Sequence, residues 1–103
     1  MFGIVYCWDV KPGCEAEFTG AWCAMTDAIK DEMGGLGSRL HHAGGQVYFA
    51  YAQWPSRDAW QQLRHPSDHM LALRAVIRAI STDRLPHLHG EIVADLFVAP
   101  DHH

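Results

Sequence analysis

The segment QVYFAYAQW, residues 46–54, constrains the fold most, because it has the composition of a β-strand and is apolar on both faces. One face carries Val47, Phe49 and Tyr51, and the other carries Tyr48, Ala50, Ala52 and Trp54. A strand that borders solvent on one side needs only one apolar face. Other parts of the protein must therefore cover this strand from both sides.

Turn residues separate the elements in the first half of the chain. Segment 2–10 is rich in β-branched and aromatic residues and ends at the turn sequence KPG. The apolar residues of segment 14–33 recur at helical spacing, and the GG pair that follows predicts the end of that helix. A second GG pair, residues 44–45, predicts a two-residue hairpin turn that joins antiparallel strands at 36–43 and 46–54.

The second half of the chain predicts two helical segments and a last strand. Ser56 can cap a short helix, and Ser67 or Asp68 can cap a longer one with an apolar stripe. The sequence GEIVADLFV, residues 90–98, has the apolar content of a strand. A polar tail, residues 99–103, follows it.

The element order βαββαβ predicts an α+β fold, namely a ferredoxin-like sandwich with an antiparallel sheet and both helical segments on one face. We interpret residues 1–103 as a single domain. The helices would cover one face of the strand 46–54. The face with Val47, Phe49 and Tyr51 would remain bare, which predicts a homodimer in which two sheets pack face to face.

Charge and hydropathy exclude two classes of partner. The chain has 8 Lys and Arg against 12 Asp and Glu, a net charge of −4, and contains no basic cluster, so nucleic acid is not an expected partner. No stretch approaches the roughly 20 apolar residues of a membrane span, and no signal sequence is recognisable, which predicts a cytoplasmic protein without a membrane partner. The three cysteines form no CxxC pair, so neither a disulfide framework nor a metal site is predicted.

The segments KPGCEAEFTGAW and GGLGSRLHHAGGQVYFAYAQWPSRDAW, together with the element order, resemble the antibiotic biosynthesis monooxygenase family of the dimeric α+β barrel superfamily. The resemblance covers nearly the whole chain. It implies a dimer whose two sheets form a barrel, with a pocket between the sheet and the helices of each subunit. It also implies a monooxygenase that acts without a cofactor on a small aromatic or polyketide-like substrate.

The resemblance also implies positions for the site. In the quinone-forming members, the site has an Asn and a Trp four residues apart on the third strand, an aromatic residue six positions later, and an Arg in the last helix. At these positions this chain has Ala50, Trp54, Trp60 and Arg74. Ala50 therefore stands where the family has an amide that binds the oxygen of the substrate.

A hairpin turn at residues 44–45 would place Arg39 opposite Ala50 and His41 opposite Tyr48, on the same face as Trp54. An imidazole beside an arginine tends to remain neutral and can accept a proton from a phenol. We therefore predict His41, Arg74 and Trp54 as catalytic residues. The predicted substrate-binding residues are Arg39, Tyr6, Tyr48, Ala50 and Trp60.

Other functions remain open at this point. Haem degradation is disfavoured, because the positions used by the haem-degrading members hold Tyr6, Leu63 and Arg74. A ligand-binding module without catalysis fits the absence of the expected Asn. A non-redox enzyme of the same superfamily, such as an isomerase, cyclase or dehydratase, would use acid–base groups without oxygen. We assign the two histidines of HLH, residues 87–89, to the surface.

Overall fold

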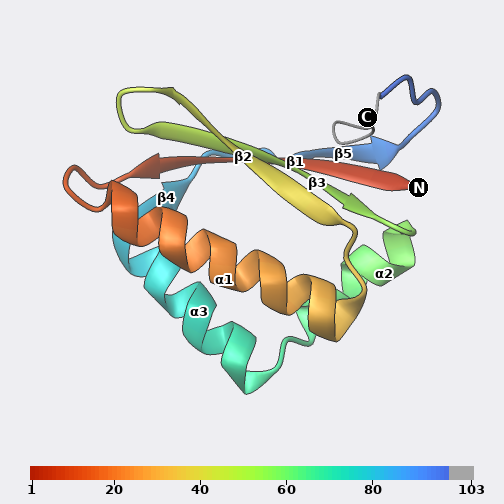
Figure 1. Ribbon diagram of the computed structural model, residues 1–103, viewed down its shortest axis with the longest axis horizontal. Helices are drawn as coiled ribbons and strands as arrows, with labels where there is room; N and C mark the ends of the chain where they lie inside the picture. Colours follow the sequence, from red (N-terminus) through yellow and green to blue (C-terminus); the bar gives the residue numbers. More distant parts are fainter. Residues whose placement is uncertain (98–103) are drawn as a thin grey trace, which may run out of the picture.

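The computed structural model describes residues 1–97, and its elements follow the predicted order with two short strands at the end (Figure 1). The strands are β1 (Phe2–Val10), β2 (Gly37–Gly44), β3 (Val47–Trp54), β4 (Ser81–Asp83) and β5 (Leu88–Glu91). The helices are α1 (Glu15–Met33), α2 (Arg57–Gln61), the 3-10 turn η1 (Gln62–Arg64) and α3 (Asp68–Ile80). The predicted α+β, ferredoxin-like architecture with an antiparallel sheet is confirmed.

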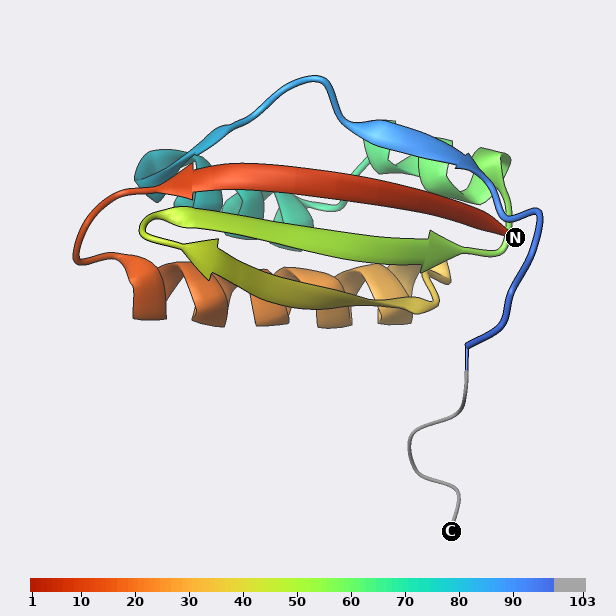
Figure 2. The same ribbon diagram turned by 90° about the horizontal axis from the view of Figure 1, so that it is seen from above.

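The strand β1 lies at the centre of the sheet, and every pair of strands is antiparallel. One edge of β1 pairs with β3, which in turn pairs with β2. The other edge pairs with β4 along Trp8–Val10 and with β5 along Phe2–Val5. The sheet of the single chain is open, and Figure 2 shows that no helix covers its outer face.

The helices lie together on the inner face of the sheet (Figure 1). The Oγ of Ser56 accepts the backbone N–H of Ala59 at 3.1 Å, and the Oγ of Ser67 accepts that of Met70 at 3.2 Å, so both predicted serine caps start helices. The helix α1 ends at Gly34, whose φ of 74° is left-handed and favours glycine. Within residues 1–97, no helix has the length and apolar character needed to cross a bilayer.

The core consists of two clusters along the inner face of the sheet. One cluster contains Trp8, Val10, Phe18, Tyr48, Ala50 and Ile80. The other contains Phe2, Ile4 and Trp54. Tyr6 is only partly buried and packs against both clusters, because it lies between Ile4 and Trp8 on the same face of β1. The candidate site lies at this junction.

The hairpin between β2 and β3 differs from the predicted one by a single residue. Gly44 pairs with Val47, so the turn is formed by Gly45 and Gln46, and Ala43 lies in a bulge of β2. Contacts outside the hairpin accompany this turn. The side-chain amide of Gln46 donates hydrogen bonds of 2.9 Å to the last residue of β1 and to the first residue of α1, which holds it at the turn.

The bulge reverses the faces that were predicted for two residues of β2. Arg39 pairs with Tyr51, and His41 pairs with Phe49. The prediction that they share a face with Ala50 is therefore wrong. A shift of one residue in register transfers every side chain to the other face, because side chains alternate along a strand.

The last strand is shorter and begins earlier than the predicted segment 90–98. The strand β5 covers Leu88–Glu91, and its final residue pairs with Phe2, the first residue of β1. The backbone N–H of Ile92 still donates to the carbonyl oxygen of Met1 at 2.8 Å, but residues 92–97 form no strand. The short strand β4 was not predicted, and residues 98–103, which include the predicted polar tail, lie outside the described residues.

Candidate functional site

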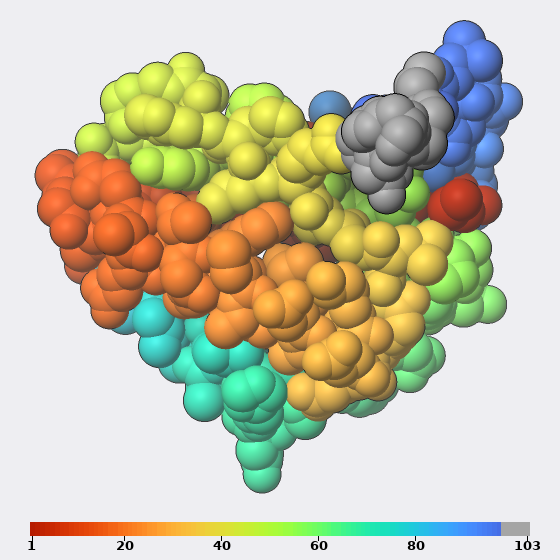
Figure 3. Space-filling view, in the orientation of Figure 1, coloured from red at the N-terminus to blue at the C-terminus, as the bar shows by residue number. Residues whose placement is uncertain are grey.

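A central cavity of about 270 Å³ lies between the sheet and the long helices. Figure 3 shows that the surface is hollowed between α1 and β2, where this cavity opens. Its apolar walls come from five elements and include Trp8, Trp22, Trp54, Leu63 and Ile77. The volume is just below the roughly 300–1,000 Å³ that is usual for small-molecule pockets.

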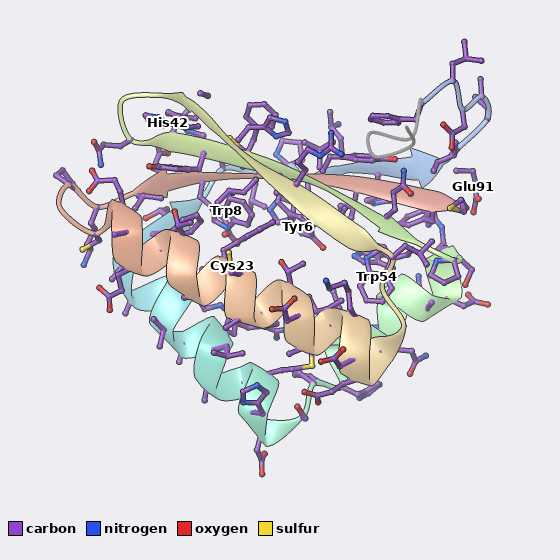
Figure 4. The ribbon with its side chains drawn as sticks, in the orientation of Figure 1. Tyr6, Trp8, Cys23, His42, Trp54 and Glu91 are labelled. Carbon is purple, nitrogen blue, oxygen red and sulfur yellow. The ribbon has the colours of Figure 1, made fainter. Side chains whose placement is uncertain are left out.

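The polar residues that line the central cavity include Tyr6, Arg74 and His87, as well as Thr26, Lys30, Ser38, Gln53, Arg78 and Asp83. Tyr6 reaches it from β1, Arg74 from α3, and His87 from the segment before β5. Figure 4 shows Tyr6 and Trp8 pointing from β1 toward the helices. An apolar cavity with a few convergent polar groups is typical of a site that binds a small organic molecule.

Tyr6 presents a hydroxyl group that is held in place by its neighbours. The indole N–H of Trp60 donates to the Tyr6 hydroxyl oxygen at 3.2 Å, and the Tyr6 ring is stacked on that of Trp8 with centroids 5.9 Å apart. Burial raises the pKa of Tyr6 above its ordinary value of 10.0, although the indole of Trp60 and the charge of Arg74 act in the opposite direction. Tyr6 is therefore a neutral phenol that can donate its own O–H into the cavity.

Arg74 faces the cavity because of its position in the apolar stripe of α3. It lies four residues after the fully buried Met70 and three residues before Ile77, so the helix places all three on one side. Within residues 1–97, the hydrogen bond of its side chain runs from Nη2 to the carbonyl oxygen of Leu63 at 3.3 Å. A guanidinium has five N–H donors, so others can bind an oxygen atom in the cavity.

Trp60 lies beside the central cavity rather than in its wall. It lines an adjoining pocket that also contacts Tyr6, Arg64 and Arg74. Its ring packs against Phe2 with centroids 5.2 Å apart. Through its hydrogen bond to Tyr6, Trp60 can orient a group that faces the cavity without touching a ligand there.

The structure brings together some of the predicted site residues and separates others. Tyr6, Trp54 and Arg74 line the central cavity. Tyr48 and Ala50 are buried in the first core cluster, with 9% and 0% of their surface exposed. Neither of these two residues lines the central cavity.

Arg39 and His41 are on the outer face, away from the central cavity, as a consequence of the bulge in β2. The ring of His41 is stacked on that of Phe49 with centroids 4.5 Å apart. The guanidinium carbon of Arg39 lies 5.8 Å from the ring centroid of Phe97. The predicted placement of these two residues in the pocket is therefore wrong.

His87 lines the cavity although the sequence interpretation assigned it to the surface. The strand alternation of HLH places His87 and His89 on the inner face, because Leu88 between them pairs with Val5 on the outer face. This alternation is the sequence signal that could have placed both histidines on the inner face of the sheet. The sequence did not show that the ring of Tyr6 would lie 4.9 Å from His87, centroid to centroid.

We expect replacement of Tyr6 by phenylalanine to change stability in a way that depends on pH. At neutral pH, loss of the hydrogen bond from Trp60 should lower the free energy of unfolding by about 1 kcal/mol. Because the folded-state pKa of Tyr6 is raised, the unfolded chain ionises first above pH 10.0, so the wild type loses stability there that Tyr6→Phe does not lose. Urea denaturation should therefore show that the free energies of unfolding of wild type and Tyr6→Phe differ less above pH 10.0 than at neutral pH. A difference in free energy of unfolding that increases with pH would contradict the buried position of the Tyr6 hydroxyl.

The fold and the cavity define an α+β protein with a cavity between its sheet and its helices, and comparison with known protein families makes this more specific. Residues 1–76 match the family described as antibiotic biosynthesis monooxygenase. The chain belongs to this family. A search of curated proteins gave no match.

Solved structures with the same fold include an oxygenase. SnoaB, a cofactor-independent oxygenase from Streptomyces nogalater, is 21% identical, with 92% of this chain and 95% of that chain covered and a TM-score of 0.78. A protein from Caulobacter crescentus, provisionally assigned as an antibiotic biosynthesis monooxygenase, is 21% identical over 90% of each chain, with a TM-score of 0.75. Rv0793 from Mycobacterium tuberculosis is 18% identical, with 93% of this chain and 98% of that chain covered and a TM-score of 0.73. At these identities the similarity shows a common fold.

Proposed function

We propose that the protein is a cofactor-independent monooxygenase that oxidises a small aromatic or polyketide-like molecule in the central cavity. The observation that carries this proposal is the position of Arg74, a cation among apolar and aromatic walls. The Arg74 guanidinium donates one hydrogen bond to the Leu63 carbonyl oxygen, and its remaining N–H donors can bind an anionic or carbonyl oxygen of a ligand. Membership of the family and the similar fold of a cofactor-independent oxygenase support the same reaction class.

The proposed reaction begins with deprotonation of a phenolic substrate, whose negative oxygen is then held by Arg74. The phenolate is electron-rich and transfers one electron to O₂ without a metal or a flavin. The two radicals combine to form a hydroperoxide at a ring carbon, and loss of water leaves a quinone carbonyl. One atom of O₂ enters the product, and the other leaves as water together with two hydrogens of the substrate.

The aromatic walls and the Tyr6 hydroxyl have separate roles in this proposal. Trp22 and Trp54 provide flat apolar surfaces for an aromatic ring and exclude water, which strengthens the interaction between Arg74 and an oxyanion. Trp60 donates to the oxygen of Tyr6, so the proton of Tyr6 is free to point toward a second oxygen of the substrate.

Ala50 separates this chain from the site that the family resemblance implies. It is fully buried against Trp8 and Tyr48 and has no polar side-chain atom, so it cannot bind the substrate oxygen in place of the expected Asn. In our proposal Arg74 and Tyr6 take over this task. The substrate should therefore carry at least two oxygens on neighbouring positions or rings.

An oxygen-uptake assay tests the reaction class. We expect metal-free protein to consume O₂ with dihydroxynaphthalenes or larger dihydroxy-aromatics, with one quinone formed per O₂ and no effect of a chelator. Turnover that persists without oxygen would instead support the non-redox enzyme. Saturable binding of such compounds without turnover in air would support the ligand-binding module, and either result would overturn the monooxygenase proposal.

We also propose that the protein forms a homodimer through the outer face of the sheet. This face carries Val5, Cys7, Val47, Phe49 and Tyr51, and no helix covers it (Figure 2). A contiguous apolar face of this kind is typical of an interface. Apolar side chains of residues 88–97 add to the exposed surface, with Leu88, Val93 and Leu96 exposed by 68%, 94% and 93%. The cytoplasmic location expected from the sequence stays a prediction.

A further inference from the structure

The charged side chains around the central cavity are mostly positive, although the chain as a whole has a net charge of −4. Lys30, Arg74 and Arg78 line the cavity, and among residues 1–97 the acidic side chain in this lining is that of Asp83. The adjoining pocket has Arg64 and again Arg74, with no acidic residue from the same part of the chain. Because positive charges gather here in an acidic protein, this region should attract an anion.

Arg78 is a cation of the cavity lining to which the proposed reaction gives no role. It follows Arg74 by four residues on α3, so the two side chains are neighbours on the surface of the helix. Like charges at this spacing destabilise a helix, and within residues 1–97 neither guanidinium forms an ion pair with a carboxylate. An anionic group of a ligand beside them would offset this repulsion.

Three other polar residues of the lining already have partners. The ammonium group of Lys30 pairs with Asp27 at 3.2 Å. The Oγ of Ser38 donates to the backbone oxygen of Tyr51 at 2.9 Å. The side-chain amide of Gln53 donates to the hydroxyl oxygen of Tyr51 at 3.3 Å. These groups are therefore less available to a ligand.

The remaining candidates are also less suited to an anion than Arg78. Thr26 is uncharged, Asp83 would repel an anion, and the Nε2 atom of His87 is closed off from solvent. Arg64 lines the adjoining pocket only, and its Nε donates to a carbonyl oxygen of its own turn at 3.3 Å. Within residues 1–97 the Arg78 guanidinium forms no hydrogen bond, so its N–H donors are available to a ligand.

We propose that Arg78 binds a carboxylate of the substrate, so that the molecule oxidised in the central cavity is a hydroxy-aromatic carboxylic acid. This inference rests on the proposed function and names its substrate class. The phenolic oxygen would lie at Arg74 and Tyr6, with the carboxylate one helical turn away. Side chains four residues apart on a helix have Cβ atoms about 5–6 Å apart, which a hydroxyl and a carboxylate on the same or adjoining rings can span. Because Arg78 is exposed, it would act at the rim of the cavity and determine affinity.

A structural role for Arg78 predicts a different result. Arg78 lies in the last turn of α3, where a positive charge stabilises the helix dipole without any ligand. Arg78→Lys keeps that charge but lacks the planar pair of donors that matches a carboxylate. The structural role therefore predicts unchanged ligand binding in Arg78→Lys, whereas carboxylate recognition predicts a partial loss.

Calorimetric titration with two ligands that differ by one charge tests the proposal without oxidation. The first is 1-hydroxy-2-naphthoate, and the second is 1-hydroxy-2-naphthamide, in which a neutral amide of similar shape replaces the carboxylate. We expect the wild type to bind the acid about 10-fold more tightly than the amide at low salt, and with a smaller preference at high salt. Arg78→Gln should remove this preference with little change in affinity for the amide, and Arg78→Lys should retain part of it.

Two further arginine variants serve as controls. Arg57→Gln removes the same charge from an exposed position over the ring of Phe2, outside both pockets. Arg64→Gln removes it from the adjoining pocket. Both variants should keep the preference for the acid. A preference that is lost in Arg64→Gln but kept in Arg78→Gln would overturn the proposal, as would a wild type that binds both ligands equally or binds neither.

Oxygen uptake separates this inference from the proposed function. If the wild type oxidises dihydroxynaphthalenes, 1,4-dihydroxy-2-naphthoate should have the lower KM, and Arg78→Gln should raise that KM about 10-fold with little change in kcat. Preferential binding of the acid through Arg78 without oxygen uptake would overturn the monooxygenase proposal and support the carboxylate site. Oxygen uptake with equal kcat/KM for 1,4-dihydroxy-2-naphthoate and 1,4-dihydroxynaphthalene would support the monooxygenase and overturn the carboxylate site.

Discussion

Replacement of Arg74 by alanine should lower kcat/KM for aromatic oxidation by about 10²- to 10³-fold, the effect of removing one donor to a developing oxyanion in a water-poor site. The guanidinium is the cation that α3 presents between Met70 and Ile77 to the apolar cavity. Without it, the negative oxygen of the deprotonated substrate would lose the guanidinium donors beside the Tyr6 hydroxyl. The phenolate should therefore form less often and persist for a shorter time.

Two further variants make this test specific. Arg74→Lys keeps the charge but lacks the planar pair of donors, so we expect an intermediate loss. Arg57→Ala is the control, because Arg57 is exposed and packs over the ring of Phe2, outside the cavity lining. Oxygen uptake should be followed together with the thermal midpoint, since Arg74 also bonds to Leu63. Full activity of a folded Arg74→Ala variant would exclude Arg74 as the oxyanion partner.

Replacement of Phe49 by glutamate should convert the proposed dimer to a monomer, with a rise of about 10²- to 10³-fold in the dimer dissociation constant. Phe49 lies between Cys7 and His41 on neighbouring strands of the outer face, near the middle of the sheet. Two-fold symmetry would place a carboxylate from each copy in the same interface. Both charges would lose water without gaining a partner.

Sedimentation velocity over a range of concentrations measures this change. Ala24→Glu is the control, since it adds the same charge at an exposed position of α1 on the helical side of the molecule. We expect wild type and Ala24→Glu to sediment as dimers and Phe49→Glu as a monomer with an unchanged far-UV spectrum. A wild type that is monomeric throughout, or a Phe49→Glu variant that stays dimeric, would contradict the proposed interface.

The secondary structure was largely predictable because its signals are local. The spacing of Phe18, Trp22 and Ile29 marks one side of α1, and the glycine at position 34 ends that helix. The serine caps at 56 and 67 likewise depend on bonds within a few residues. Such features need no knowledge of distant parts of the chain, which is why they agree with the structure.

The candidate site was predictable only in part. Tyr6, Trp54 and Arg74 could be named from strand faces, the apolar stripe of α3 and the family resemblance, and all three line the cavity. Arg39 and His41 were misplaced, because a one-residue bulge reverses the faces of a strand. The turn beside this bulge is hydrogen-bonded through Gln46 to β1 and α1, and the hairpin sequence does not reveal these contacts.

The sequence by itself determined the α+β architecture, the family, and the presence of a strand at 46–54 that needs cover on both faces. Alternation and helical periodicity are properties of neighbouring residues, so they can be recognised without a structure. Only the tertiary structure decided the hairpin register and the place of His87 beside Tyr6, 81 positions earlier in the chain. Contacts between residues so far apart depend on how β5 pairs with β1, and local sequence patterns carry no information about that pairing.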